Sequence, residues 1–170
     1  MKKIFLVILT IFVIGGCVSH APSLPEGYRG PIAFVQDSEH RIDQGKADLF
    51  YLHAIDGREI RNSRTRSRSA SLYQGDVLTT VLQENQVQTG QRVLTLVGRT
   101  AYAMPARSWA GTVYEVKGEV RLTLIENGAY IIRGKLAEEG SIVWIEDQTT
   151  GEMLGSVEVE GPSKLNFFEK

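Results

Sequence analysis

The chain of 170 residues is poor in the residue types that most often build chemical sites. It has a single cysteine, Cys17, and only three histidines, His20, His40 and His53. One cysteine can form neither an intramolecular disulfide nor a cysteine-based metal site. No His-x-x-x-His pair, EF-hand loop, glycine-rich phosphate motif or Gly-x-Ser-x-Gly elbow is present. We therefore expect no metal site and no catalytic residue, and a domain held together by its core alone.

The composition is that of a globular protein without an excess of either charge. Hydrophobic residues make up 42% of the chain and charged residues 23%, and the net charge is −1. The chain is too apolar to be disordered, and its length suits one domain. Loss of the two positive charges of Lys2 and Lys3 with a leader would bring the net charge to −3. This balance predicts no nucleic-acid partner.

Residues 1–16 have the pattern of an export signal. Lys2 and Lys3 precede the apolar run from Ile4 to Ile14, and Gly15 and Gly16 follow as small residues before a cleavage point. The run is shorter than the roughly 20 residues that cross a bilayer as a helix. We predict a cleaved signal peptide, with an uncleaved membrane anchor as the alternative.

The four residues Ile14-Gly15-Gly16-Cys17 resemble the bacterial lipobox. That resemblance implies cleavage before Cys17, a diacylglyceryl group on its sulfur and a further acyl chain, such as palmitate, on its new amino group. Several acyl chains would give firm attachment to a membrane, whereas one chain binds only marginally. Val18 stands where lipoproteins kept in the inner membrane carry aspartate, which favours the periplasmic face of the outer membrane. The alternative for Cys17 is an inert small residue of the leader.

Behind the leader we expect a tether, one domain and a short tail. Residues 17–31 contain Pro22, Pro25 and Pro31 and form the predicted semi-extended tether. Residues 32–161 carry short apolar runs separated by turn residues. This pattern is typical of an all-β fold, and we predict a single antiparallel β-sandwich, or a barrel-like variant, of about seven or eight strands. Residues 162–170 remain as a C-terminal tail.

Three turns organise the predicted strands. Asp56-Gly57 lies between Leu49–Ile55 and Arg58–Arg61, and Asn127-Gly128 lies between Glu119–Ile125 and Ala129–Leu136. Both dipeptides favour two-residue hairpins, and the second is the clearest because its flanks alternate between apolar and polar residues. Thr150-Gly151 joins Ile142–Ile145, a continuous apolar run typical of a strand buried on both faces, to Met153–Val159. Further strands are predicted at Ile32–Gln36, Val77–Leu82 and Val93–Val97. Short helices near Ala70–Tyr73 or Tyr102–Trp109 are alternatives.

One segment concentrates positive charge. Arg61, Arg64, Arg66 and Arg68 fall within eight residues that contain no acid. Guanidinium groups bind phosphate and carboxylate with two hydrogen bonds, so these arginines are candidate contacts for an anion or a partner. The candidate partners are an envelope protein, peptidoglycan or an anionic lipid. The alternative is a solvated polar loop, which is the more common role of a charge run.

The other residues that could take part in catalysis or metal binding form no recognisable site pattern. His53 lies in a predicted strand with Asp56 nearby, and a side chain on the wet face of that strand is the simpler interpretation. Glu138-Glu139 and Glu146-Asp147 are adjacent carboxylates. Because neighbouring strand residues point to opposite faces, we do not expect either pair to converge on one metal ion. Trp144 is expected in the core. Trp109 is a candidate binding aromatic, although a lid on the core is the expected use.

The order of these motifs resembles that of small uncharacterised proteobacterial lipoproteins. The matching segments are Val87–Val97, Val120–Tyr130 with its Asn-Gly, and Val143–Gly151, which ends in Asp-Gln-Thr-Thr-Gly. The resemblance implies a β-sandwich in the periplasm and carries no catalytic residue to any position.

Three functions are compatible with these residues. We favour a membrane-anchored, non-enzymatic binding or structural module of the cell envelope. A periplasmic hydrolase would need a pocket holding at least two of His53, Asp56 and the carboxylates near Glu146. A carrier of a small apolar ligand would need an unfilled cavity inside the sandwich.

Overall fold

The computed structural model describes residues 21–170, so the predicted signal peptide at 1–16, Cys17 and residues 18–20 lie outside the described range. The described residues form ten strands and two short helices. Along the chain these are β1 (Ile32–Gln36), β2 (Ser38–Asp43), β3 (Lys46–Ile55), β4 (Arg58–Glu59), α1 (Ser63–Ala70), β5 (Glu84–Gln88), β6 (Gly90–Tyr102), α2 (Pro105–Ala110), β7 (Glu115–Leu124), β8 (Ala129–Lys135), β9 (Gly140–Asp147) and β10 (Met153–Glu160).

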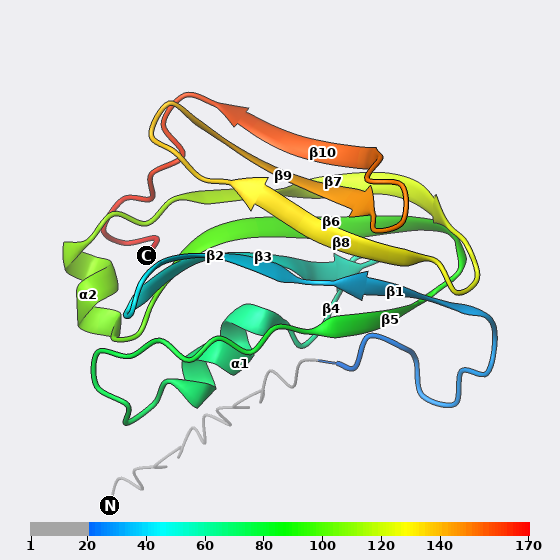
Figure 1. Cartoon of the computed structure of the whole chain (residues 1–170), viewed down its shortest axis with the longest axis horizontal. Coiled ribbons are helices and arrows are strands. Elements are labelled where there is room, and N and C mark those ends of the chain that lie inside the picture. Colours follow the sequence, from blue (N-terminus) through cyan, green and yellow to red (C-terminus); the bar gives the residue numbers. More distant parts are fainter. Residues whose placement is uncertain (1–20) are drawn as a thin grey trace, which may run out of the picture.

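The strands form two sheets that face each other (Figure 1). The first sheet has the order β10-β9-β8-β1-β5, and the second has the order β2-β3-β6-β7, with β4 paired to β3. All pairs are antiparallel except β1 and β8, which run parallel. This confirms the predicted all-β sandwich, with more strands than expected and one parallel pair. The chain changes sheet four times, between β1 and β2, between β4 and β5, between β5 and β6, and between β7 and β8.

The central core fills the space between the two sheets. Phe50 and Leu52 of β3 and Leu94 and Leu96 of β6 point into it from the second sheet, and β1, β8 and β9 contribute from the first. Because successive side chains of a strand alternate in direction, the intervening residues of β3 and β6 point to the opposite face.

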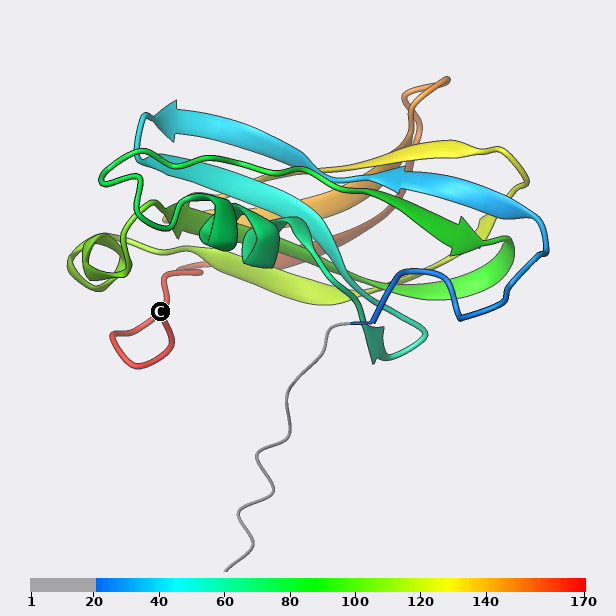
Figure 2. The ribbon, with the colours of Figure 1, turned by 90° about the horizontal axis from the view of Figure 1, so that it is seen from below.

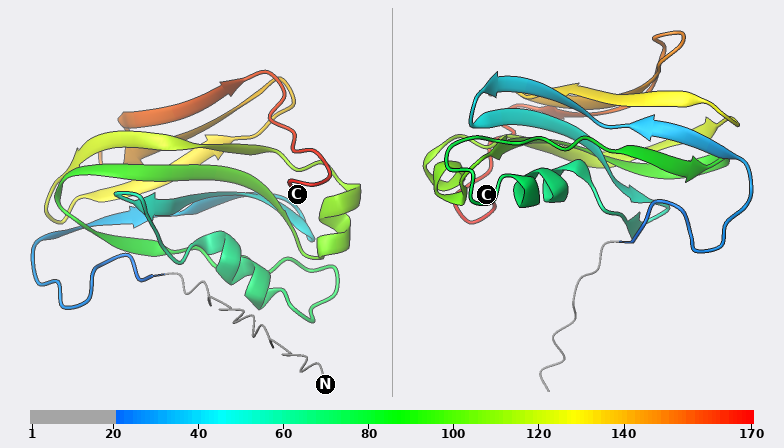
Figure 3. Two further views of the ribbon diagram at one scale, coloured as in Figure 1. Left: turned by 180° about the vertical axis from the view of Figure 1, so that it is seen from behind. Right: turned by 60° about the horizontal axis from the view of Figure 1, so that its bottom comes forward.

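A third layer covers that opposite face. Figure 2 and Figure 3 show α1 and the chain that follows it lying against the outside of the second sheet. A smaller outer core lies beneath this layer and contains Leu49 and Tyr51 of β3, Val97 of β6 and Leu78 of the covering chain. Strands β3 and β6 are therefore buried on both faces over most of their length.

Several turns occur where the sequence predicts them. Asp56 and Gly57 both have positive φ angles, of 50° and 78°, as a type I′ turn requires, and they join β3 to β4. Gly151, with φ of 71°, lies in the turn between the paired strands β9 and β10. Short helices are found at 63–70 and 105–110, next to or within the ranges considered from sequence.

The hairpin predicted at Asn127-Gly128 is wrong. Strand β7 pairs with β6 in the second sheet and β8 pairs with β9 and β1 in the first, so this turn carries the chain between sheets. The turn's backbone bonds to β1 instead: the Asn127 N–H donates to the Ile32 carbonyl, and the Phe34 N–H donates to the Gly128 carbonyl, both at 2.8 Å. The Tyr130 hydroxyl accepts the Ile125 N–H at 3.1 Å. These bonds replace those of a local hairpin.

Two further expectations about strands are wrong. Residues 77–82 are extended but form no strand, because their backbone groups bond to side chains of α1 and β2. The run Ile142–Ile145 lies in β9 but is not buried on both faces, since Val143 and Ile145 are buried while Ile142 and Trp144 are only half-buried. Trp144 points away from the core, and its indole N–H donates to Glu146.

Close contact between the sheets depends on glycine at position 134 of β8. A Cβ atom added there would lie 2.4 Å from the ring of Phe50 and 2.7 Å from the Ile142 carbonyl oxygen. We expect Gly134→Ala to lower the free energy of unfolding by about 1–3 kcal/mol, because the core is already filled. Urea denaturation measures this, with Ser156→Ala on the exposed side of β10 as a control expected to change stability by less than about 0.5 kcal/mol. Equal stability of the two variants would contradict the close approach.

Candidate functional site

Helix α1 is held in place by a row of three serines spaced four residues apart. Ser63 and Ser67 lie in the helix, and Ser71 ends it; all three are buried. Their hydroxyl oxygens accept the backbone N–H groups of Gln83, Val81 and Thr79 at 2.9, 2.8 and 2.9 Å. Four residues of helix rise about 6 Å, and two residues of extended chain span about 6.6 Å. The serine row therefore matches the extended segment 79–83 bond for bond.

The beginning of α1 is fixed by its own cap. Asn62 lies at the N-cap, and its side-chain oxygen accepts the Thr65 N–H at 3.1 Å. Such a cap stabilises a helix by about 0.5–2 kcal/mol. The helix has no apolar stripe, so this cap and the serine row determine where it starts and which face it presents to the protein.

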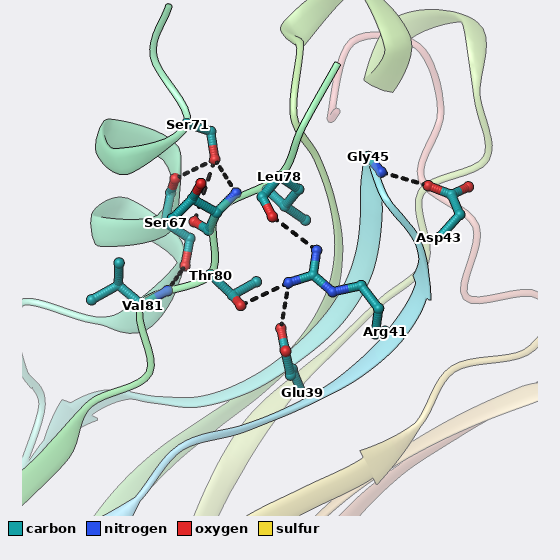
Figure 4. A network of polar contacts seen from close by, with 10 residues as sticks. Glu39, Arg41, Asp43, Gly45, Ser67, Ser71, Leu78, Thr80 and Val81 are labelled. Atoms are coloured by element: carbon teal, nitrogen blue, oxygen red, sulfur yellow. Dashed lines mark hydrogen bonds and ion pairs between the residues drawn. The ribbon is translucent and has the colours of Figure 1, made fainter. Parts of the chain in front are cut away.

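The extended segment is bound from its other side by β2. Figure 4 shows Arg41 opposite the helix, with its guanidinium donating to the Leu78 carbonyl at 2.9 Å and to the Thr80 hydroxyl at 2.8 Å. The Leu78 N–H donates to the Gln44 carbonyl at 2.9 Å. Because its polar groups are satisfied on both sides, the segment forms a rigid base for α1.

Asp37 lies at the centre of this arrangement, between β1 and β2, and is 1% exposed. Its carboxylate accepts the Leu52 N–H at 3.0 Å, an Asn85 amide N–H at 3.3 Å and the Ser63 hydroxyl. Its own N–H donates to the Gln83 carbonyl at 2.8 Å. Burial raises the pKa of Asp37 to about 7, against the smaller opposing effect of these hydrogen bonds.

A pocket of about 230 Å³ opens beside α1, where the helix, α2, the end of β6 and the C-terminal residue meet. Four cationic side chains line it: Arg64 and Arg68 of α1, Arg99 of β6 and Lys170. No carboxylate side chain is among the lining residues of this pocket. We call it the basic pocket.

The cations of the basic pocket differ in their partners. Arg99 forms an ion pair with Glu115 and donates to the Glu169 carbonyl at 3.1 Å, and Lys170 donates to carbonyl oxygens of α2 and its end. Arg64 and Arg68 have no carboxylate within 4.0 Å among residues 21–170. They are four residues apart, which places like charges on one helix face. Burial lowers the pKa of Arg64; the charges of Arg99 and Arg68 act in the same direction, and Tyr51 and Glu115 oppose them.

The rest of the pocket lining is partly apolar. Leu78, Ala101, Ala103 and Val113, which we call the floor, line it together with the hydroxyl residues Ser67, Thr100 and Ser108 and with Trp109 of α2, which is 55% exposed. Trp109 is therefore not the lid on the core that the sequence suggests. The pocket can hold an anionic group against the guanidinium groups and an apolar group against the floor.

The structure divides the four arginines of the charge run. Only Arg64 and Arg68 line the basic pocket. Arg66 lies on another side of α1 and donates to the Gln83 side chain at 3.1 Å, and Arg61 precedes the helix. The segment is a helix rather than the polar loop that the sequence suggests. Arg99 and Lys170 are distant in sequence and no local pattern indicates them, whereas the four-residue spacing of the serines is a signal for the helix.

The residues considered for hydrolysis do not line the pocket. His53 is bonded to Glu59 at 3.2 Å, and burial lowers the pKa of this histidine. Asp56 accepts the Val93 N–H and pairs with Arg92, and Glu146 pairs with Arg133. Within residues 21–170, no group of three His, Cys, Asp or Glu side chains is placed to hold a metal ion.

The described part of the chain contains no helix long and apolar enough to cross a membrane. The residues from Ala21 onward are attached to the domain: Arg58 donates to the Pro22 and Ser23 carbonyls at 2.6 and 2.7 Å. Part of the tether predicted at residues 17–31 is therefore bound to the domain.

The site is thus a basic, partly apolar pocket on the outside of an all-β sandwich, between two short helices. No family model, no curated protein and no solved structure matches this chain.

The buried carboxyl of Asp37 makes stability depend on pH. With a pKa of about 7 in the folded protein, against 3.8 as the ordinary value, the folded state binds more protons between these two pH values. The contribution of Asp37 to the free energy of unfolding is therefore highest below pH 4 and is lost as pH rises through 7, by about 4 kcal/mol at most. Asp37→Asn should flatten this slope in urea denaturation between pH 4 and 8. Glu158→Gln, an exposed change on β10, should keep it. A slope that persists in Asp37→Asn would assign the effect to another group.

Proposed function

We propose that this chain is a lipid-anchored binding module of the cell envelope, whose binding site is the basic pocket. In this proposal Cys17 carries the acyl chains, residues 18–20 lead to the domain, and the outer membrane is the favoured location. The partner is an anionic component of the envelope. The proposal does not involve catalysis.

The observation that carries the proposal is the pair of arginines in the pocket, Arg64 and Arg68. Both are aligned on one helix face, and neither has a carboxylate within 4.0 Å among residues 21–170. Like charges four residues apart destabilise a helix, so their placement has a cost that a bound anion would offset. Bidentate bonds to phosphate or carboxylate are the interaction that guanidinium groups make best. Binding therefore explains an arrangement that folding alone would disfavour.

The competing functions gain less support from the geometry. A hydrolase site would need His53, Asp56 or Glu146 to converge, and each is bonded in a different place. A carrier with its ligand between the sheets would need space there, and the central core is filled by large buried side chains.

The anchor is tested by labelling the chain with an alkyne fatty acid in a bacterial host that processes lipoproteins. We expect the label on the protein, a mass that begins at Cys17, and recovery in the membrane fraction. Cys17→Ala should abolish all three. An unlabelled chain that retains Met1 would refute the anchor.

The binding site is tested by retention on isolated envelopes, using the chain from residue 18 onward, which holds both sheets and every contact of the pocket. We expect salt-sensitive retention that falls about thirtyfold in the double variant Arg64→Glu/Arg68→Glu, since two lost charged contacts are worth roughly 1 kcal/mol each. The double variant Arg61→Glu/Arg66→Glu changes the net charge equally, outside the pocket, and should be retained nearly as well as the unaltered chain. Equal loss in both would mean that overall charge, rather than the pocket, mediates retention.

A further inference from the structure

We propose that the basic pocket binds the anionic head, phosphate or carboxylate, of an amphiphile whose apolar chain leaves the pocket past Trp109. This inference rests on the pocket part of the proposed function and names the ligand class. It is independent of the acyl chains on Cys17.

The head of such a ligand is defined by the guanidinium groups. Arg64 and Arg68 are the two cations without a carboxylate partner within residues 21–170, while Arg99 behind them keeps its ion pair with Glu115. Arg64 and Arg68 can together bind one anionic group. A second anion would have to bind Arg99 or Lys170, which already have partners. The partly buried guanidinium of Arg64 is poorly solvated, and a charged hydrogen bond gains strength where water is excluded.

The apolar part of the ligand is indicated by the floor of the pocket. Leu78, Ala101, Ala103 and Val113 offer no hydrogen-bond partner other than backbone, and Trp109 adds an aromatic wall. A volume of about 230 Å³ is below the roughly 300–1,000 Å³ of sites for drug-sized ligands. The pocket therefore accommodates a head group and the first few methylenes, and the rest of a longer chain must lie outside.

The surface around the opening provides a place for that remainder. Ten large hydrophobic side chains are exposed in residues 21–170, and six of them belong to the three segments that surround the pocket. These segments are the loop after α1, α2 with its cap, and the C-terminal tail, which lie at the same end of the molecule (Figures 1 and 3). The six residues are Leu72, Tyr73, Met104, Trp109, Phe167 and Phe168. Exposed aromatics beside basic residues are typical of protein surfaces that contact lipid interfaces.

The test uses hexyl phosphate, a soluble amphiphile, with inorganic phosphate and hexanol as comparisons, in isothermal titration against the chain from residue 18 onward. Each methylene that is fully buried should tighten binding about fourfold. We therefore expect hexyl phosphate to bind at least tenfold more tightly than inorganic phosphate, and hexanol to show no measurable binding. Equal affinity for hexyl phosphate and inorganic phosphate would refute an amphiphile as the ligand.

The residues are tested with two double variants of equal charge change. Arg64→Glu/Arg68→Glu should abolish binding of hexyl phosphate, and Arg61→Glu/Arg66→Glu should leave it within about twofold of the unaltered chain. If the first variant shows no cooperative unfolding transition and is therefore not folded, Arg64→Gln/Arg68→Gln replaces it. We expect this variant to bind hexyl phosphate at least tenfold more weakly than the unaltered chain. Full affinity in either pocket variant would overturn the assignment.

A second arm distinguishes the source of the amphiphile. Flotation with vesicles of phosphatidylcholine, with or without 30% phosphatidylglycerol, reports whether a bilayer lipid can enter the pocket. Flotation that requires phosphatidylglycerol and both Arg64 and Arg68 supports a membrane lipid, whereas hexyl phosphate binding without flotation supports a free amphiphile. If envelope retention depends on these arginines but hexyl phosphate does not bind, the ligand class fails and the proposed function stands.

Discussion

The structure depends on a single buried carboxyl group at the point where the chain first crosses between its sheets. Asp37 is the single residue between β1 and β2, which belong to different sheets, and it is buried where they diverge. Its side chain joins β3, β5 and the start of α1 through hydrogen bonds to Leu52, Asn85 and Ser63. A buried carboxyl is tolerated only when its bonds are made, and these bonds are also what position the helix.

The basic pocket follows from that positioning. The serine row binds one face of α1 to the extended segment, and the opposite part of the helix is left to carry Arg64 and Arg68. The helix is held by neutral hydroxyl-to-backbone bonds rather than by ion pairs. Arg64 and Arg68 therefore take no part in holding the helix in place, which leaves them available to an external anion.

The sequence predicts this fold best where a structural signal is local. Asp56, Gly57 and Gly151 form their turns because aspartate and glycine adopt positive φ angles more readily than other residues. Asn127-Gly128 misleads because the same dipeptide suits any tight reversal, and only the distant partner β1 decides that the strands separate. The sandwich itself is predictable from alternating apolar residues, but its third layer is not, since α1 has polar residues on every face.

The candidate site is predictable only in part for the same reason. The charge run identifies Arg64 and Arg68 together with Arg61 and Arg66, and nothing in the linear sequence separates the pairs. Only the helix places Arg64 and Arg68 together and apart from Arg61 and Arg66. The four-residue spacing of the serines at 63, 67 and 71, whose hydroxyls bond to the extended segment, indicates that helix. Arg99 and Lys170 join the site only through tertiary structure, 35 or more positions along the chain from Arg64.

The parallel pairing of β1 with β8 constrains the order of assembly. Residues 34–36 bond to residues 129–131, so the first sheet cannot close until most of the chain is present. Strands β8, β9 and β10 form a local meander, β1 and β5 form a second pair, and the parallel pairing of β1 with β8 joins the two. Pairings between distant segments slow folding and leave strand edges exposed in the interval. A chain delivered from its N-terminus could pair one edge of β1 with β5, but the other edge would stay unpaired until residues 129–131 arrive.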